Sequence, residues 1–166
     1  MATAAAILCA LFALNLGAPV ALYQQQVATY REGAKTLLLP DGSTLNVNAN
    51  TQLRIDFTAQ VRNIYLEQGQ LYIDVAPNKE PPLVVHAGDA QIKVVGTGFD
   101  VRRSQRQLEV SVAHGQVAFM PDAKTSTLLG AQQQATYDYA KGTLQTHTLN
   151  ANDVGNWHSG RLSFRN

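Results

Sequence analysis

Apolar residues occupy every second position in several short stretches of the chain after about residue 36. The alternation is clearest in 44–49, 53–57, 70–75 and 108–112, where polar residues fill the positions between. A period of two places apolar side chains on one face of a β-strand and polar side chains on the other. This region shows no long stretch with the helical period of about 3.6 residues. The pattern therefore predicts an all-β domain over residues 36–149.

Turn-forming residues separate these stretches. They are Pro40-Asp41-Gly42, Gln68-Gly69, Ala87-Gly88-Asp89, His114-Gly115 and Lys141-Gly142. Frequent turns between short strands are typical of an antiparallel β-sandwich, a jelly roll or a short solenoid-like stack. We expect residues 150–166 to close this domain, with a short helical turn near 152–157. Trp157, the only tryptophan, is expected to cover one end of the core.

The beginning of the chain has a different character. The first 30 residues contain no charged side chain, and 2–22 are almost wholly apolar. As a helix this run would be roughly 30 Å long, which matches the hydrocarbon thickness of a bilayer. It predicts one transmembrane helix as an anchor over 1–22, followed by a juxtamembrane linker over 23–35. A secretory signal and a buried core helix remain alternative interpretations.

Composition narrows the classes of function. The 166 residues suffice for one domain and an anchor, and the net charge is only +1. A nucleic-acid-binding protein usually presents a strongly basic surface, so we expect no nucleic-acid partner. The single cysteine, Cys9, can form neither an internal disulfide nor a zinc site with other thiols.

Few residues suggest catalysis. The segment 94–98 contains two glycines but lacks the third glycine of a dinucleotide fingerprint. Asp56, Asp74 and Asp100 fall on the polar phase of strands, where we expect solvated carboxylates. The four histidines lack the spacing of a helical metal site, so the sequence predicts neither a metal nor a cofactor. We therefore expect no metabolic enzyme.

The Gly96-Thr97 bond is the candidate for a single covalent event. A threonine hydroxyl can attack the preceding carbonyl carbon where the backbone is strained and a base is near, and water can cut the resulting ester. The simpler interpretation is a tight bend or bulge between two strands.

Tyrosines suggest an alternative function. Tyr65, Tyr72, Tyr137 and Tyr139 could form an aromatic platform for an envelope carbohydrate or polymer. Tyrosine is also common on half-buried strands, which is the simpler explanation. The alternative prediction is a carbohydrate-binding β module in which Tyr137 and Tyr139 contact the ligand.

Ordered sequence blocks resemble the FecR family of transmembrane anti-sigma regulators. The blocks are LPDGSTLNVNA (39–49), LEQGQLYIDVA (66–76), PLVVH (82–86), VVGTGFDV (94–101), VSVAHGQV (110–117), LGAQQ (129–133) and WHSGRLSF (157–164). They follow the family's order from about Thr36 to Phe164. The chain departs from the family pattern at Gln70, His114 and Ala131, where an acidic residue, a glutamate and a glycine are usual.

The resemblance implies a periplasmic all-β FecR domain behind a single-pass anchor in the inner membrane. It implies contact with the signalling domain of a TonB-dependent outer-membrane receptor, typically one for iron-siderophore uptake. The signal would then reach an ECF sigma factor through a cytoplasmic domain, which we expect to be absent from this chain. Some members cleave themselves at the corresponding Gly-Thr bond, which maps here to Gly96 and Thr97.

Overall fold

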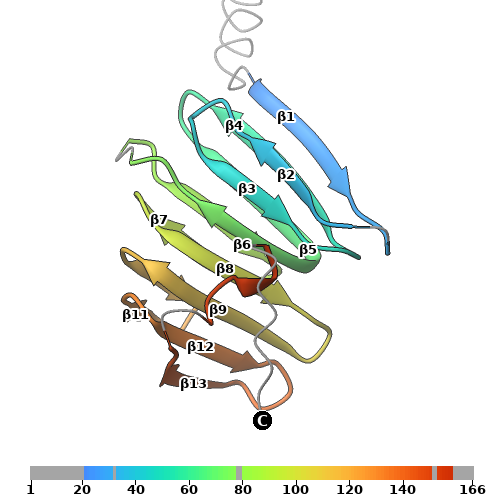
Figure 1. Ribbon diagram of the computed structural model, residues 1–166. Helices are drawn as coiled ribbons and strands as arrows, with labels where there is room; N and C mark the ends of the chain where they lie inside the picture. The colour runs from blue at the N-terminus through green and yellow to red at the C-terminus, as the bar shows by residue number, and fades with distance from the viewer. Residues whose placement is uncertain (1–20, 32, 78–79, 151–152, 159–166) are drawn as a thin grey trace, which may run out of the picture.

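The computed structural model describes residues 21–31, 33–77, 80–150 and 153–158. Within these ranges the chain forms strands and one short 3₁₀ helix, η1 (Asn156–His158), as Figure 1 shows. The strands are β1 (Ala21–Ala28), β2 (Lys35–Leu38), β3 (Thr44–Val47), β4 (Gln52–Thr58), β5 (Arg62–Asp74), β6 (Leu83–Ala87), β7 (Ala90–Val94), β8 (Gly98–Arg103), β9 (Gln107–His114), β10 (Val117–Met120), β11 (Thr127–Leu129), β12 (Gln133–Asp138) and β13 (Thr143–Thr148). The prediction of an all-β fold is confirmed.

The strands form one curled, open sheet whose two halves share β5. Residues 62–68 of β5 pair with β4, and the first of them also pair with β6. Residues 69–74 pair with β8, and the last of them also pair with β3. We call the two sides half A and half B. Half A runs β1-β4-β5-β6-β7-β10-β11, and half B runs β2-β3-β5-β8-β9-β12-β13.

Both halves contribute their apolar faces to one core. In β7, and in β4 as far as Phe57, the buried residues occupy every second position, as the sequence pattern predicts. Ile55 and Ile64 from half A and Phe99 and Val110 from half B are fully buried in the same cluster. The polar faces of the strands therefore point away from the core.

The sequence predicts a turn between strands at Gly69. The structure instead places Gly69 inside β5. It has a φ of +97°, and a Cβ there would lie 2.6 Å from the Cα of Thr51. The Thr51 hydroxyl accepts a hydrogen bond from the Gln70 N–H at 3.0 Å. Glycine is therefore required where β5 passes from half A to half B. The other four predicted turns do separate strands.

The β5–β6 pair is parallel, which departs from the expected antiparallel sheet. After leaving half A, the chain runs through half B along 69–74 and returns to begin β6 beside the start of β5. Parallel neighbours require such a crossover connection. Here the second part of β5 serves as part of the crossover.

Strand β1 occupies much of the range expected to be a linker, 23–35. It pairs with β4 and buries Val27, while the Tyr23 ring packs 6.3 Å from the ring of Phe57. The alternation of apolar and polar residues does not reveal β1 in the sequence, because the polar Gln25 takes an inward position between Tyr23 and Val27. Residues 1–20, most of the expected anchor, lie outside the described residues. In the described part of the chain, no helix is both long and apolar enough to cross a membrane.

Candidate functional site

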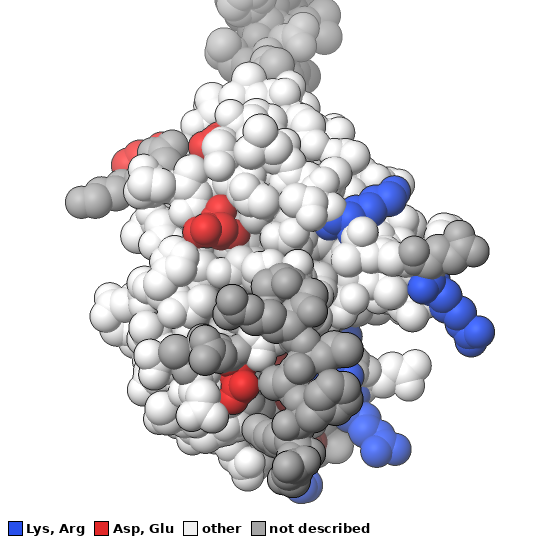
Figure 2. Space-filling model, in the orientation of Figure 1, with Lys and Arg blue, Asp and Glu red and all other residues white. Residues whose placement is uncertain are grey.

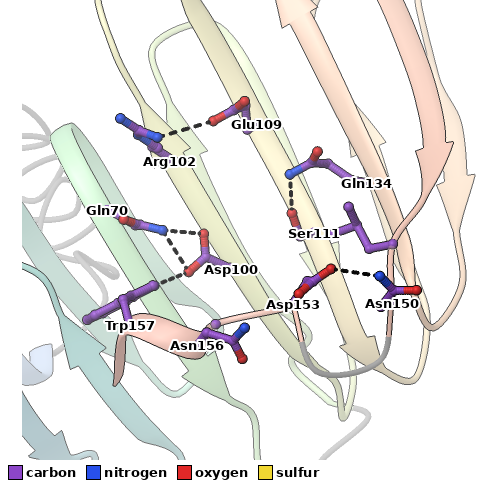
Figure 3. Close-up of a pocket in the computed structure, with 12 residues that line it drawn as sticks. Gln70, Asp100, Arg102, Glu109, Ser111, Gln134, Asn150, Asp153, Asn156 and Trp157 are labelled. Carbon is purple, nitrogen blue, oxygen red and sulfur yellow. Dashed lines mark hydrogen bonds and ion pairs between the residues drawn. The ribbon is translucent and has the colours of Figure 1, made fainter. Parts of the chain in front are cut away.

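The outer face of half B carries a polar groove, shown in Figure 3. It has a volume of about 610 Å³ and lies between strands β5, β8, β9 and β12 and the residues 149–150 and 153–157. Side chains from neighbouring strands line up across its floor. In register these are Asp100, Ser111 and Gln134. The groove therefore combines a row of polar side chains on the sheet with a cover from the C-terminal segment.

Asp100 is buried in this groove, contrary to the expectation of a solvated carboxylate. It is 6% exposed because Trp157 covers it and donates its indole N–H to Oδ2 at 2.6 Å. The side-chain amide of Gln70 donates to Oδ1 at 2.9 Å and to Oδ2 at 3.1 Å. Burial raises the pKa of Asp100 to about 6, although the hydrogen bonds from Trp157 and Gln70 oppose that rise.

A chain of hydrogen bonds determines which of these groups donate and which accept. The backbone N–H of Ala49 donates to the Asn48 side-chain oxygen at 2.8 Å, so the Asn48 NH₂ group must face Gln70. That group donates to the Gln70 oxygen at 2.9 Å, which turns the Gln70 NH₂ group toward Asp100. Trp157 can only donate. Asp100 is therefore held as an acceptor by neutral donors on two sides.

The charged neighbours of Asp100 lie nearer to solvent. Arg102 and Glu109 form a loose ion pair of 3.9 Å, and the Arg102 side chain is 64% exposed. The Glu109 charge raises the pKa of Asp100 and the Arg102 charge lowers it, each less than burial does. Burial therefore has the largest effect on the pKa of the Asp100 carboxyl.

The sequence predicts that Trp157 covers one end of the core, but the structure does not place it there. It lies in η1 on the outer face of half B, and the ring of its neighbour His158 stacks on Tyr72 with centroids 4.0 Å apart. The described part of 150–166 therefore closes over the polar face of the sheet. This placement could not be predicted, because no residue near Trp157 in the chain indicates which face it will cover.

Other polar groups of the groove bond to one another. The Gln134 amide donates to the Ser111 hydroxyl at 2.7 Å, and the Asn150 amide donates to Asp153 at 3.2 Å. Across the described residues, no three His, Cys, Asp or Glu side chains gather as a metal site would require. These bonds therefore satisfy polar groups within the sheet and within the C-terminal segment separately.

The Gly96-Thr97 bond lies in the bend that joins β7 to β8. Thr97 is 1% exposed, and its hydroxyl donates to the carbonyl oxygen of Gln116 at 2.9 Å. A Cβ at Gly115 would lie 2.9 Å from both the Gly96 carbonyl oxygen and the Thr97 hydroxyl oxygen. Glycine at 115 therefore lets the turn after β9 pack directly on this bond. The structure shows the bend that the simpler interpretation required.

A histidine and an aspartate stand next to this bend. His114 pairs in register with Gly98, the residue that follows Thr97. Its Nε2 lies 3.2 Å from Asp74 Oδ1, and both side chains are 57% exposed. The Thr97 hydroxyl itself points to a carbonyl oxygen and not to this imidazole.

The four tyrosines do not form one platform. They lie in three places: Tyr65 against His86, Tyr72 against His158, and Tyr137 against Tyr139. Tyr137 is 9% exposed, and its hydroxyl donates to Asp122 at 2.8 Å. Tyr139 is 38% exposed, so it alone of that pair offers substantial surface to a ligand.

Charged side chains are sparse on the face that Figure 2 shows. Most visible atoms belong to uncharged residues, with Lys and Arg extending along one edge and Asp and Glu scattered elsewhere. This view therefore presents no broad surface of one sign.

The sequence matches a known protein family. Residues 25–118, more than half of the chain, match the family described as FecR protein. The chain belongs to the FecR family. The matched range contains both Gly96-Thr97 and Asp100, and Trp157 lies beyond it. The predicted resemblance is therefore confirmed.

Two solved structures resemble this FecR chain. Both are crystal structures of a proposed anti-sigma factor from Parabacteroides distasonis, and both are 26% identical to this chain. One has a TM-score of 0.78 and covers 86% of this chain; the other has a TM-score of 0.77 and covers 85%. In each case 68% of the solved chain is matched. The search of curated proteins gave no match.

Proposed function

We propose that this chain is the sensor part of a FecR-type anti-sigma regulator. Its β domain binds the signalling domain of a TonB-dependent outer-membrane receptor and relays ligand occupancy toward an ECF sigma factor. The observation that carries the proposal is the FecR match over 25–118, supported by the likeness to a proposed anti-sigma factor. The regulated process would typically be iron-siderophore uptake. The protein catalyses no metabolic reaction in this role.

The open sheet supports a role in binding. Strands β1, β2, β11 and β13 each pair on one side only within the described residues. The β13 residues are mostly exposed as well. Edge strands expose backbone donors and acceptors that a strand of another protein can meet. A curled sheet with several edges therefore suits a docking module.

Binding to the receptor is tested directly by calorimetry. The full chain is titrated with the isolated signalling domain of a TonB-dependent receptor from the same organism, and we expect saturable one-to-one binding for the cognate receptor. In cells, deletion of the gene should change the output of a reporter driven by the cognate ECF sigma factor. No heat of binding together with an unchanged reporter would contradict the proposed function.

The same proposal places the β domain in the periplasm, behind an inner-membrane anchor in 1–22. Protease added to spheroplasts should then degrade the β domain, while a cytoplasmic control protein stays intact. Complete protection of the β domain would exclude this placement.

We also propose a single self-cleavage at Gly96-Thr97. The Thr97 hydroxyl oxygen attacks the Gly96 carbonyl carbon, the C–N bond breaks, and the hydroxyl proton ends on the freed Thr97 amine. Water then hydrolyses the ester, which yields the Gly96 carboxylate and restores the hydroxyl. The tight packing of the bend against Gly115 supports this proposal because it fixes both reacting groups.

Intact mass of the purified chain tests the cleavage. Wild type and Thr97→Ser should yield a fragment that ends at Gly96, whereas Thr97→Ala should stay whole because it has no nucleophile. A wild-type chain that remains full-length would remove this second proposal and leave the docking function standing.

A further inference from the structure

Residues 153–158, which we call the strap, lie across half B without joining its strand ladder. Among the described residues, the strap forms no strand. Between described residues, its backbone bonds are local, from the Asp153 N–H to the Asn150 carbonyl at 2.9 Å and from the His158 N–H to the Gly155 carbonyl at 3.1 Å. Side-chain contacts therefore have a large share in holding the strap on the sheet.

Two aromatic contacts tie the strap to the sheet. The Trp157 indole N–H donates to Asp100 at 2.6 Å, and the His158 ring stacks on Tyr72 at 4.0 Å. Both sheet residues belong to the same register pair of β5 and β8. A hydrogen bond to a charged acceptor is worth enough to change the ratio of closed to open strap by about 10- to 100-fold.

Gly155 sets how closely the strap approaches. It has a φ of +68°, and a Cβ there would lie 2.6 Å from the Tyr72 ring. Any larger residue must therefore lift the strap or displace Tyr72. This position gives a way to disturb the strap without altering the sheet sequence.

The strap is separate from the apolar core. The core cluster extends from Val27 to Tyr137 and contains no residue of 153–158 among those described. Beneath Trp157 lie Asp100 and Gln70, which are polar and bonded to their own neighbours. Within the strap, Val154 is 9% exposed. Lifting the strap would therefore hydrate polar groups of the sheet and expose Val154, while the core cluster stays closed.

We propose that the strap is a releasable cover, held by Trp157 on Asp100, which opens while the sheet stays folded. Opening exposes Tyr72 and Asp100, the register pair beneath the strap, as new surface on half B. The protein then has two states, closed and open, and the Trp157 and His158 contacts set the ratio between them. This inference goes beyond the receptor contact proposed above and stands without it.

Trp157 reports on the strap directly, because it is the only tryptophan in the chain. In the full chain carrying Gly155→Ala, we expect its emission to shift to the red and its quenching by acrylamide to rise. Hydrogen exchange at the His158 amide should quicken by about 10- to 100-fold, the factor that the lost tie predicts. Amides of β8 and β9 should keep their protection.

Gly142→Ala is the matched control. Gly142 has a φ of +61°, and a Cβ there would meet only the Tyr137 hydroxyl at 3.9 Å, in the β12–β13 turn. It carries a similar backbone cost without touching the strap. Its Trp157 emission and His158 exchange should match those of the wild type.

Asp100→Leu opens the strap from the sheet side, because it removes the acceptor of the Trp157 N–H. It should reproduce the emission and exchange changes of Gly155→Ala. Wild-type emission and exchange in Gly155→Ala would overturn the proposal. Equal loss of protection in the strap and in β8 and β9 would also overturn it, since the two would then unfold together. Receptor binding is measured separately, so either result leaves the proposed function to its own test.

Discussion

Arg62 and Asp41 form a buried ion pair that joins the two halves of the sheet, with 2.7 Å between Nη1 and Oδ2. Their side chains are only 4% and 10% exposed. Arg62 also donates from Nε to the Pro81 carbonyl oxygen at 2.8 Å, and Asp41 accepts from the Ser43 N–H at 2.9 Å. The turn between β2 and β3 is thereby fixed to the start of β5.

Removing the cation from this pair should be costly. We expect Arg62→Met to lower the free energy of unfolding by about 3–5 kcal/mol, because it leaves the Asp41 carboxylate buried without its charged partner. Urea unfolding followed by circular dichroism measures the loss. Arg102→Met breaks an exposed pair and should cost less than about 1 kcal/mol. Equal losses of unfolding free energy in the two variants would contradict the expectation that the buried pair contributes more to stability than the exposed pair.

Gly69→Ala should weaken the passage of β5 between the halves. The new Cβ would lie 2.6 Å from the Thr51 Cα at a φ of +97°, so both overpacking and backbone strain oppose it. We expect a loss of about 2–4 kcal/mol in the free energy of unfolding. Gly33→Ala serves as control, since its Cβ would meet nothing within 4 Å. Identical stabilities of the two variants would show that Thr51 yields without cost.

Stability should depend on pH through Asp100. Burial raises its pKa to about 6 from an ordinary value of 3.8, so the folded state binds the proton more tightly than the unfolded state. The contribution of Asp100 to stability therefore improves as pH falls through 6 toward 4, and it is least favourable above 6. Relative to Asp100→Asn, the wild type should gain roughly 2 kcal/mol between about pH 7.5 and about pH 4.

The comparison of wild type with Asp100→Asn isolates the effect of the Asp100 carboxyl on stability. Glu109, Arg102, Tyr72 and His158 surround Asp100 and are present in both, so their own titrations largely cancel. In Gly155→Ala the opened strap would let water reach Asp100, and the gain at low pH should shrink. A difference between wild type and Asp100→Asn that stays constant with pH would contradict the shifted pKa.

Gly115→Ala should slow self-cleavage, if Gly96-Thr97 is cut as proposed. A Cβ at 115 would press on both the carbonyl and the hydroxyl of that bond, and small misplacements of reacting groups can cost about 100-fold in rate. The time course of fragment formation by intact mass measures it. Gly42→Ala is the control, because its Cβ would meet Ala76 at an ordinary 3.7 Å. Equal rates in both variants would separate Gly115 from the reaction.

Much of the fold could be predicted because period-two alternation depends on neighbours along the chain. It revealed β3, β4, the second part of β5 and β9, and turn residues revealed most of the turns. It failed at β1, where Gln25 occupies an inward position, and at Gly69, where a glycine within a strand has the signature of a turn. In both places a long-range contact, to β4 or to Thr51, decides the conformation.

The site was less predictable for the same reason. Gly96-Thr97 could be singled out from its dipeptide and its family block. The burial of Asp100 depends on Trp157, which lies 57 positions further along the chain. Alternation places Asp100 on the outer face correctly, but it carries no information about what covers that face.

Since β5 forms ladders with strands of both halves, neither half can be pulled from the other without breaking this one strand from its neighbours. Tension entering at β1 reaches β5 through β4 and continues into β8. The body should therefore resist stretching as a single rigid link, rupturing once and not in stages. Such a link can convey force across its whole width without any internal hinge.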